Sequence, residues 1–139
     1  MNAPVYSNSS QHVVGPRRHY TFQDAMLEPT VAHEGVGQIL TRRVEGGERS
    51  QGANFIDLTI LPPGTSIGVH RHGPDNEELY IIVSGHGRML LDGKEFDVGP
   101  GDVVVNSALG QHALCNLGSE PIRLVVVEVP LRQPEAIAC

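Results

Sequence analysis

The stretch "GVHRHGPDNEELYIIVSG", residues 68–85, carries the pattern that is most informative about the fold and the functional site of this chain. His70 and His72 lie two residues apart, and the acidic pair Glu77 and Glu78 precedes a strongly apolar run. Side chains alternate across a β-strand, so the two imidazoles face the same side and the two adjacent carboxylates face opposite sides. The pattern therefore predicts either metal ligands built into a β-sheet or a polar loop that leads into a buried strand.

The sequence around this stretch is typical of an all-β protein. Sixteen glycines and ten prolines separate short runs rich in Val, Ile, Leu and Thr, and the dipeptide Asp92-Gly93 is a good hairpin turn. Many short strands at regular spacing favour an antiparallel sandwich or barrel. We expect strands over residues 36–44, 54–61, 66–72, 78–83, 86–91, 95–98, 102–106, 111–116 and 122–129.

The first 20 residues are polar and irregular, and we expect them to form a flexible N-terminal arm. Residues 21–27 could form one short helical turn, with Thr21 as its cap. The length of 139 residues favours one domain, so residues 21–139 are expected to form a single barrel.

Composition excludes several classes of function. The net charge of −6 argues against a general nucleic-acid or anionic-membrane partner. No run approaches the roughly 18 apolar residues needed to span a bilayer, and the N-terminal segment lacks the apolar core of a signal peptide. Two cysteines do not make a disulfide framework. A cytoplasmic location is the resulting expectation.

A third histidine completes a candidate ligand set. His112 lies at the start of a distant strand, where a lone histidine would more often be a core or rim residue. Three histidines and one carboxylate, however, are a full set of ligands for a first-row transition metal. A carboxylate entering an apolar barrel needs a compensating charge, which a divalent ion supplies.

At this point the sequence resembles the cupin superfamily of small β-barrels. The first cupin motif is glycine, five residues, His-x-His, three or four residues, Glu, six residues, glycine. Gly64 is followed by five residues and then His70 and His72, and counting back six residues from Gly85 leads to Glu78. The loop is then one residue longer than usual. Glu77 restores the loop length but breaks the spacing to the final glycine, so it remains the alternative ligand.

The second cupin motif is glycine, five residues, Pro-x-Gly, two residues, His, three residues, Asn. Gly101, His112 and Asn116 fit this spacing, whereas Ser107 stands at the proline position and Leu109 at the glycine position. The resemblance implies a double-stranded β-helix, the jelly-roll cupin barrel. It also implies one divalent transition metal (Mn, Fe, Ni, Co, Cu or Zn) held by His70, His72, Glu78 and His112.

Four further residues are candidates for the substrate site, each with a simpler alternative. Tyr80 shares the face of Glu78 and could donate a hydrogen bond to a substrate or only pack. His86 could support a metal ligand, act as an acid–base group or be an exposed turn residue. Gln111 on the rim and His33 before the first long strand are weaker candidates.

The fold alone does not fix a function. The site predicts a metal-dependent enzyme that acts on a small oxygenated substrate by Lewis-acid chemistry, as an isomerase, cyclase or lyase. Small cupins encoded beside polyketide pathways act as cyclases. A dioxygenase, an oxalate-decarboxylase-like oxidoreductase and a non-catalytic small-molecule binding or sensor protein are the alternatives. The resemblance also implies a homodimer.

Overall fold

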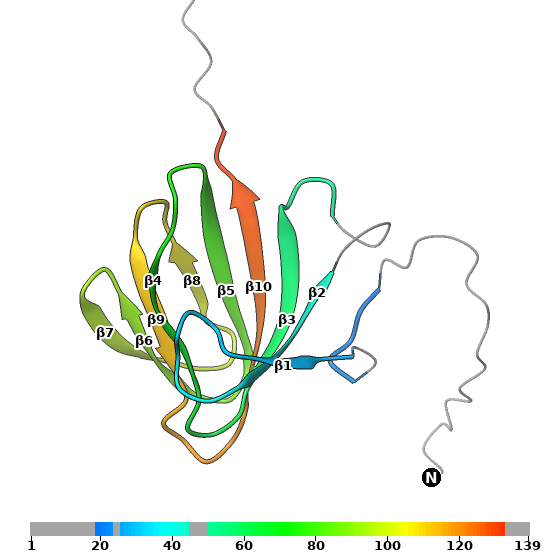
Figure 1. Ribbon diagram of the computed structural model, residues 1–139, viewed down its shortest axis with the longest axis vertical. Helices are drawn as coiled ribbons and strands as arrows, with labels where there is room; N and C mark the ends of the chain where they lie inside the picture. The colour runs from blue at the N-terminus through cyan, green and yellow to red at the C-terminus, as the bar shows by residue number, and fades with distance from the viewer. Residues whose placement is uncertain (1–18, 24–25, 45–49, 133–139) are drawn as a thin grey trace, which may run out of the picture.

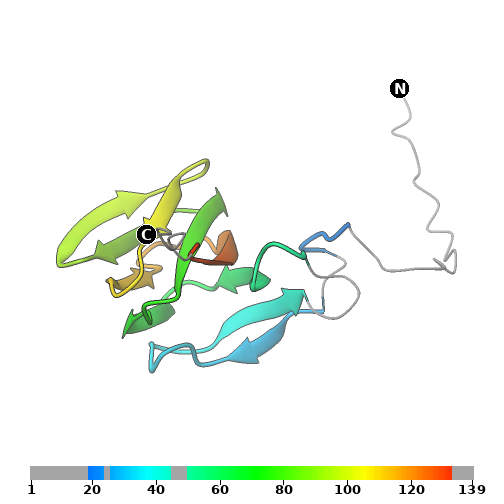
Figure 2. The same ribbon diagram turned by 90° about the horizontal axis from the view of Figure 1, so that it is seen from above.

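The computed structural model describes residues 19–23, 26–44 and 50–132. Within these ranges the chain forms ten strands and no helix, which confirms the predicted all-β class. The strands form two antiparallel sheets that face each other and close into a double-stranded β-helix (Figures 1 and 2). The described part of the chain accordingly contains no helix long or apolar enough to cross a membrane.

The two sheets differ in size. The six-stranded sheet contains, in spatial order, β1 (Glu28–Thr30), β2 (Ile39–Val44), β3 (Phe55–Leu61), β10 (Ile122–Pro130), β5 (Asn76–Ser84) and β8 (Val103–Asn106). The four-stranded sheet contains β4 (Ser66–Arg71), β9 (Gln111–Cys115), β6 (Gly87–Leu91) and β7 (Lys94–Val98). Neighbours in space are often distant in sequence, because the chain crosses repeatedly between the two sheets.

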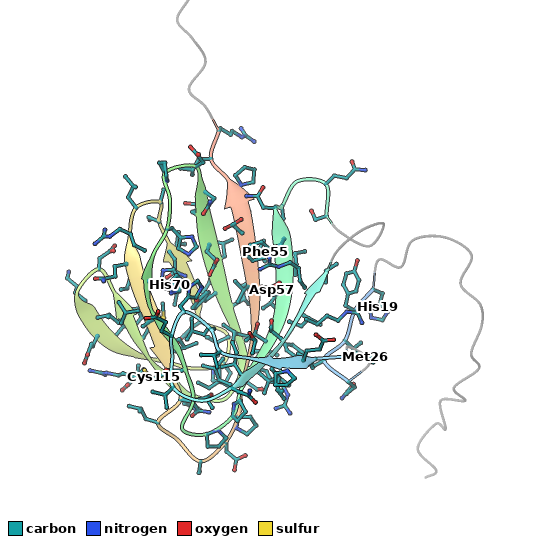
Figure 3. All side chains as sticks on the ribbon, viewed as in Figure 1. His19, Met26, Phe55, Asp57, His70 and Cys115 are labelled. Atoms are coloured by element: carbon teal, nitrogen blue, oxygen red, sulfur yellow. The ribbon has the colours of Figure 1, made fainter. Side chains whose placement is uncertain are left out.

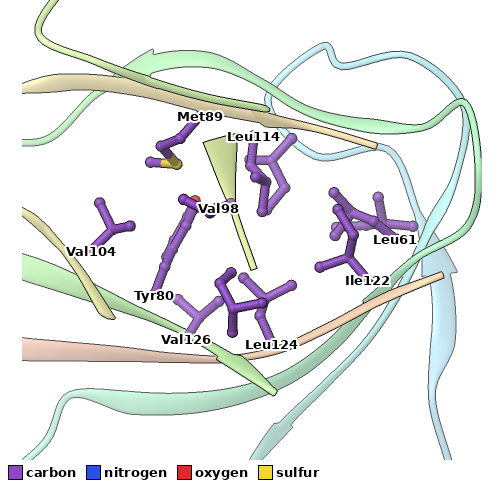
Figure 4. Close-up of a cluster of buried hydrophobic side chains, with 12 residues drawn as sticks. Leu61, Tyr80, Met89, Val98, Val104, Leu114, Ile122, Leu124 and Val126 are labelled. Atoms are coloured by element: carbon purple, nitrogen blue, oxygen red, sulfur yellow. The ribbon is translucent and has the colours of Figure 1, made fainter. Parts of the chain in front are cut away.

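The core lies between the sheets and follows from the alternation of side chains along each strand. On β10, Ile122, Leu124 and Val126 point inward and are at most 5% exposed. Met89 and Leu114 meet them from the four-stranded sheet (Figure 4). Burial of this aliphatic surface is the main favourable contribution to folding. Glu78, Asn106 and His112 are polar residues that are buried as well.

Several expected boundaries are wrong. The strand expected from residue 36 starts at Ile39, because Gly37 has a φ of 69° and forms a bend. Strand β1 was not expected, and it pairs with β2 over three residues. A turn at residues 22–23 stands where a helical turn was expected, although residues 24–25 lie outside the described residues. Residues 1–18, most of the expected arm, also lie outside them.

The loop between β1 and β2 is held tightly on strand β4. The amide of Gly68 donates to the carbonyl of Ala32 at 3.0 Å, and the amide of Ser66 donates to the carbonyl of Val36 at 2.9 Å. A Cβ atom on Gly68 would lie 2.0 Å from the carbonyl oxygen of His33, so only glycine allows this approach. The contact brings His33 onto the strand that carries His70.

Candidate metal centre

Four side chains from both sheets meet inside the barrel. His70 on β4 and His112 on β9 are cross-strand partners, so their side chains project together from the four-stranded sheet. Glu78 on β5 reaches them from the six-stranded sheet, and His72 follows the end of β4. One possible ligand atom from each residue lies within 4.8 Å of all the others. The structure places Glu78 in this cluster, whereas Glu77 is its neighbour on the opposite face of β5.

The distances within the cluster suit a shared ion. Oε2 of Glu78 lies 3.5 Å from Nε2 of His72, and Oε1 lies 3.7 Å from Nε2 of His112. These separations are long for hydrogen bonds. Two ligands that bind one ion at about 2.1 Å lie roughly 3.0–3.5 Å apart. The Nε2 atoms of His72 and His112 are buried without a hydrogen-bond partner, so the cluster could hold a divalent ion.

Two of the imidazoles are oriented by hydrogen bonds from their other nitrogen. Nδ1 of His70 lies 2.7 Å from the carbonyl oxygen of Gly68, and Nδ1 of His72 lies 3.1 Å from Oδ1 of Asn76. A carbonyl oxygen only accepts, so each Nδ1 carries the proton and each Nε2 keeps a free lone pair. Such partners fix the ring orientation that a metal ligand needs.

The electrostatics of the cluster favour a neutral imidazole at His70 and an ionised carboxylate at Glu78. Burial acts to raise the pKa of Glu78, but the imidazoles of His112, His72 and His70 outweigh it and lower that pKa below its ordinary value. Burial is the main cause that lowers the pKa of His70 to about 4, partly opposed by the hydrogen bond to Gly68. At neutral pH His70 and Glu78 therefore present the protonation states that metal binding requires.

His33 is brought into direct contact with the cluster. Its ring stacks on that of His70, with the centroids 3.5 Å apart and the planes at 7°. Burial is the main cause that lowers the pKa of His33, so its imidazole is neutral at pH 7. Of the four candidates for the substrate site, His33 and Tyr80 are the two whose rings contact the ligand set.

The other candidates are placed differently. Tyr80 is 1% exposed and its ring meets that of His112 edge-on, with centroids 5.3 Å apart. Gln111 neighbours His112 on β9, so its side chain faces the opposite side of the sheet. His86 is exposed and lines a separate pocket with Leu117, which none of the four cluster residues lines.

Asn106 is a buried polar residue that the sequence did not single out. It is 1% exposed, is the cross-strand partner of Glu78, and has no hydrogen-bond partner for either amide atom. The alternation of side chains along β8 could have identified it, because it turns Asn106 inward together with Val104. A polar residue at an inward position of an apolar strand indicates a functional interior.

A cavity of about 350 Å³ extends from the cluster into the barrel. Glu78, Tyr80 and His33 line one part of it, and Phe55 and Asp57 on β3 line another. Figure 3 labels His70, which lies on the four-stranded sheet, and Phe55 and Asp57, which lie on β3 of the six-stranded sheet. The volume suits a small organic molecule.

The fold and this histidine–carboxylate cluster define a cupin. A family model described as "Cupin domain" matches residues 57–128, and the chain belongs to this family. Both motifs that suggested the resemblance, from Gly64 to Asn116, lie wholly inside that match.

Individual relatives extend the comparison. The chain is 32% identical to an L-ectoine synthase of Bordetella petrii over 93 residues, covering 66% of this chain and 67% of that protein. It is 32% identical to an oxalate-binding protein of Thermotoga maritima over 71 residues, covering 51% and 58%. The crystal structure of a predicted oxalate decarboxylase from Thermotoga maritima superposes with a TM-score of 0.71 at 24% identity, covering 78% of this chain and 96% of that one. The alignments span between 56% and 68% of the curated relatives.

Replacing Glu78 by Gln is expected to abolish tight metal binding. The isosteric amide removes the negative charge and one ligand atom, so zinc affinity should fall by more than the 10–100-fold typical of losing a supporting partner. Glu77→Gln is the matched control, because Glu77 faces away from the cluster. Competition with a chromophoric chelator measures both variants, with circular dichroism as a check on folding. Equal zinc affinity in the two variants would refute the ligand assignment.

The stability of the metal-free protein is expected to fall as the pH drops from about 6.5 to about 4. Over this range the unfolded chain protonates His70, whose pKa is about 4 in the folded chain, so the unfolded state gains protons. Above pH 6.5 this contribution is constant. Urea denaturation at pH 7.5, 5.5 and 4.5 measures the slope, which should be shallower in His70→Gln. Parallel curves for the two proteins would contradict the assignment.

Proposed function

We propose that this protein is a metal-dependent cupin enzyme that binds a small oxygenated organic molecule and polarises it without oxidising it. Isomerase, cyclase or lyase chemistry fits this description. The observation that supports the proposal is the carboxylate of Glu78, which faces three imidazoles at one end of a cavity of about 350 Å³. A ligand set that meets a cavity of ligand size, here through Glu78, is the arrangement that substrate chelation requires.

His70, His72, Glu78 and His112 would hold one divalent ion, with Mn, Fe, Ni, Co, Cu and Zn all compatible with the mixed nitrogen and oxygen donors. When bound, such an ion supplies Lewis acidity toward a carbonyl, enediol or catechol oxygen. Four protein ligands leave about two positions for substrate oxygens in an octahedral site.

The residues around the cluster would orient the substrate and keep its environment dry. Burial is the main cause that raises the pKa of Tyr80 well above 10, so its phenol stays protonated and can donate a hydrogen bond. Ile39, Ile67 and Val126 line the same cavity with apolar surface. Because an apolar lining lowers the local dielectric constant, hydrogen bonds and charges inside the cavity act more strongly than in water.

A second candidate function is an oxidoreductase of the dioxygenase or oxalate-decarboxylase type. The likeness to an oxalate-binding protein and to a predicted oxalate decarboxylase, both from Thermotoga maritima, supports it. The likeness to the oxalate-binding protein also supports a third candidate, a protein that binds a small molecule and releases it unaltered.

The test of the leading proposal is hydrogen–deuterium exchange next to a substrate carbonyl. In D₂O under argon, the manganese- or zinc-loaded protein is expected to accelerate exchange at C3 of a suitable 2-oxo acid by at least about a hundredfold. His112→Ala should lose this activity, whereas Glu77→Gln should retain it, as measured by proton NMR.

Two other outcomes would contradict the Lewis-acid proposal. Turnover of catechols, flavonols or 2-oxo acids that consumes O₂ stoichiometrically and stops under argon would favour the dioxygenase. Tight binding of a compound that is recovered unchanged, with no exchange, would favour the binding protein. Either result would replace the Lewis-acid proposal.

We also propose that the protein is a homodimer. Strand β8 lies at the edge of the six-stranded sheet, and its outward residues Val103 and Val105 are 57% and 48% exposed beside Val83, which is 47% exposed. An apolar sheet edge of this kind tends to pair with another chain. A second copy presents the same surface and could cover it symmetrically.

Light scattering during gel filtration tests the dimer. At micromolar concentration the protein is expected to elute as a dimer, and Val103→Lys/Val105→Lys is expected to give a folded monomer. Val69→Lys is the control, because Val69 is 53% exposed on the other sheet. A monomeric wild-type protein, or a dimer that survives the double substitution, would contradict this surface.

A further inference from the structure

The inner face of strands β2 and β3 carries four polar residues in two cross-strand pairs. Thr41 pairs with Thr59, and Arg43 pairs with Asp57 in the next inward position. All four line the same cavity as Glu78. We call these four residues the polar ladder. Thr59 is buried, Thr41 and Asp57 are partly buried and Arg43 is exposed, so the polar ladder runs from the interior of the barrel to its surface.

The polar ladder has hydrogen-bonding capacity to spare. Oγ1 of Thr41 and Oγ1 of Thr59 lie 3.2 Å apart and share one hydrogen bond. Two hydroxyls that share one bond still hold one donor and several acceptor lone pairs. Asp57 accepts two bonds from Arg43, at 2.9 Å and 3.0 Å, and each carboxylate oxygen keeps a further lone pair.

The charges at the two ends of the cavity differ. The charges of Arg43 and Asp57 cancel, and the guanidinium also stacks over the ring of Phe55 at 3.7 Å from its centroid. The ladder end is therefore polar but neutral overall. The cluster end carries the carboxylate of Glu78, and a divalent ion would leave a net charge of about +1 there.

We propose that the polar ladder is the second half of the ligand site and takes an uncharged hydrogen-bonding group, an amide or a hydroxyl. The metal end of the same ligand is anionic and oxygen-rich, so the ligand class is a small chelating acid or enediol with a neutral polar far end. This inference rests on the proposed function for its metal end only. The hydroxyls of the ladder donate to the far group, and Asp57 accepts from it.

Three catechols that share the same chelating diol but differ in the opposite substituent test what the polar ladder binds. Zinc, which is inert toward oxidation, is loaded into the metal-stripped protein. The probes are 3,4-dihydroxybenzamide, 3,4-dihydroxybenzoate and 4-isopropylcatechol, which carry an amide, a carboxylate and an apolar group of similar shape. Calorimetry is expected to show the amide binding about tenfold tighter than either of the others, as one or two net hydrogen bonds would give.

The variants remove the ladder without disturbing the fold. Thr41→Val/Thr59→Val replaces both members of a hydroxyl pair by groups of the same shape, which costs little stability. It is expected to abolish the preference for the amide and leave the affinity for 4-isopropylcatechol unchanged. Asp57→Asn should also reduce the preference. Asp97→Asn, in the matched cross-strand pair with Arg88 outside this cavity, should leave it intact.

The results separate the two proposals. Equal affinity for the amide and the isopropyl compound, or a preference that survives Thr41→Val/Thr59→Val, would overturn the ladder assignment and leave the metal end standing. Tightest binding of 3,4-dihydroxybenzoate would also overturn it, because Arg43 would then have exchanged Asp57 for the ligand.

Benzamide lacks the diol that would bind the metal, so it tests the polar ladder independently of the metal. In the metal-free protein it is expected to shift the backbone NMR signals of Thr41 and Thr59, and unmoved signals would count against the ladder even if no catechol binds.

Discussion

The buried carboxylate of Glu78 is the constraint on which the polar end of this barrel depends. It is 7% exposed, and a carboxylate so far from water is costly unless opposite charge or hydrogen bonds compensate it. The chain surrounds it with imidazoles from the facing sheet rather than with a cation of its own. These imidazoles lower the pKa of Glu78 and so favour its ionised form, and imidazole nitrogens are also good ligands for a metal. The arrangement could therefore hold an ionised carboxylate and a divalent ion together.

The rest of the site follows from holding that group in place. Cross-strand pairing of β4 with β9 sets His70 against His112, and the hydrogen bonds of the two oriented imidazoles turn their Nε2 atoms inward. The contact between the β1–β2 loop and Gly68 adds the ring of His33 to the outside of the cluster. The strand pairing, the imidazole hydrogen bonds and the loop contact each restrict the position or orientation of a side chain in the cluster. Preorganisation of this kind lowers the cost of binding.

Sequence could predict the elements that depend on local pattern. The strand period, the turn residues and the spacing from Gly85 to Glu78 are local, and they led to the barrel and to the four residues that the structure gathers. The loop residue that made Glu77 an alternative is accommodated before β5, which begins at Asn76. The stacking of His33 and the pairing of Asp57 with Arg43 depend instead on which strands become neighbours. The local sequence pattern does not indicate which strands become neighbours.

The missed residues nevertheless share one physical property. Asn106, Asp57 and Thr59 are polar residues at inward positions of strands whose other inward residues are mostly apolar. Core positions favour apolar side chains so strongly that a polar one persists only where it has a partner or a ligand. Once the barrel assigns each strand a face, Asp57 and Thr59 line the cavity that Glu78 also lines, and Asn106 is the cross-strand partner of Glu78. Because the fold alone does not fix a function, such inward polar residues are where chains that share the cupin scaffold can differ in the small molecules they accept.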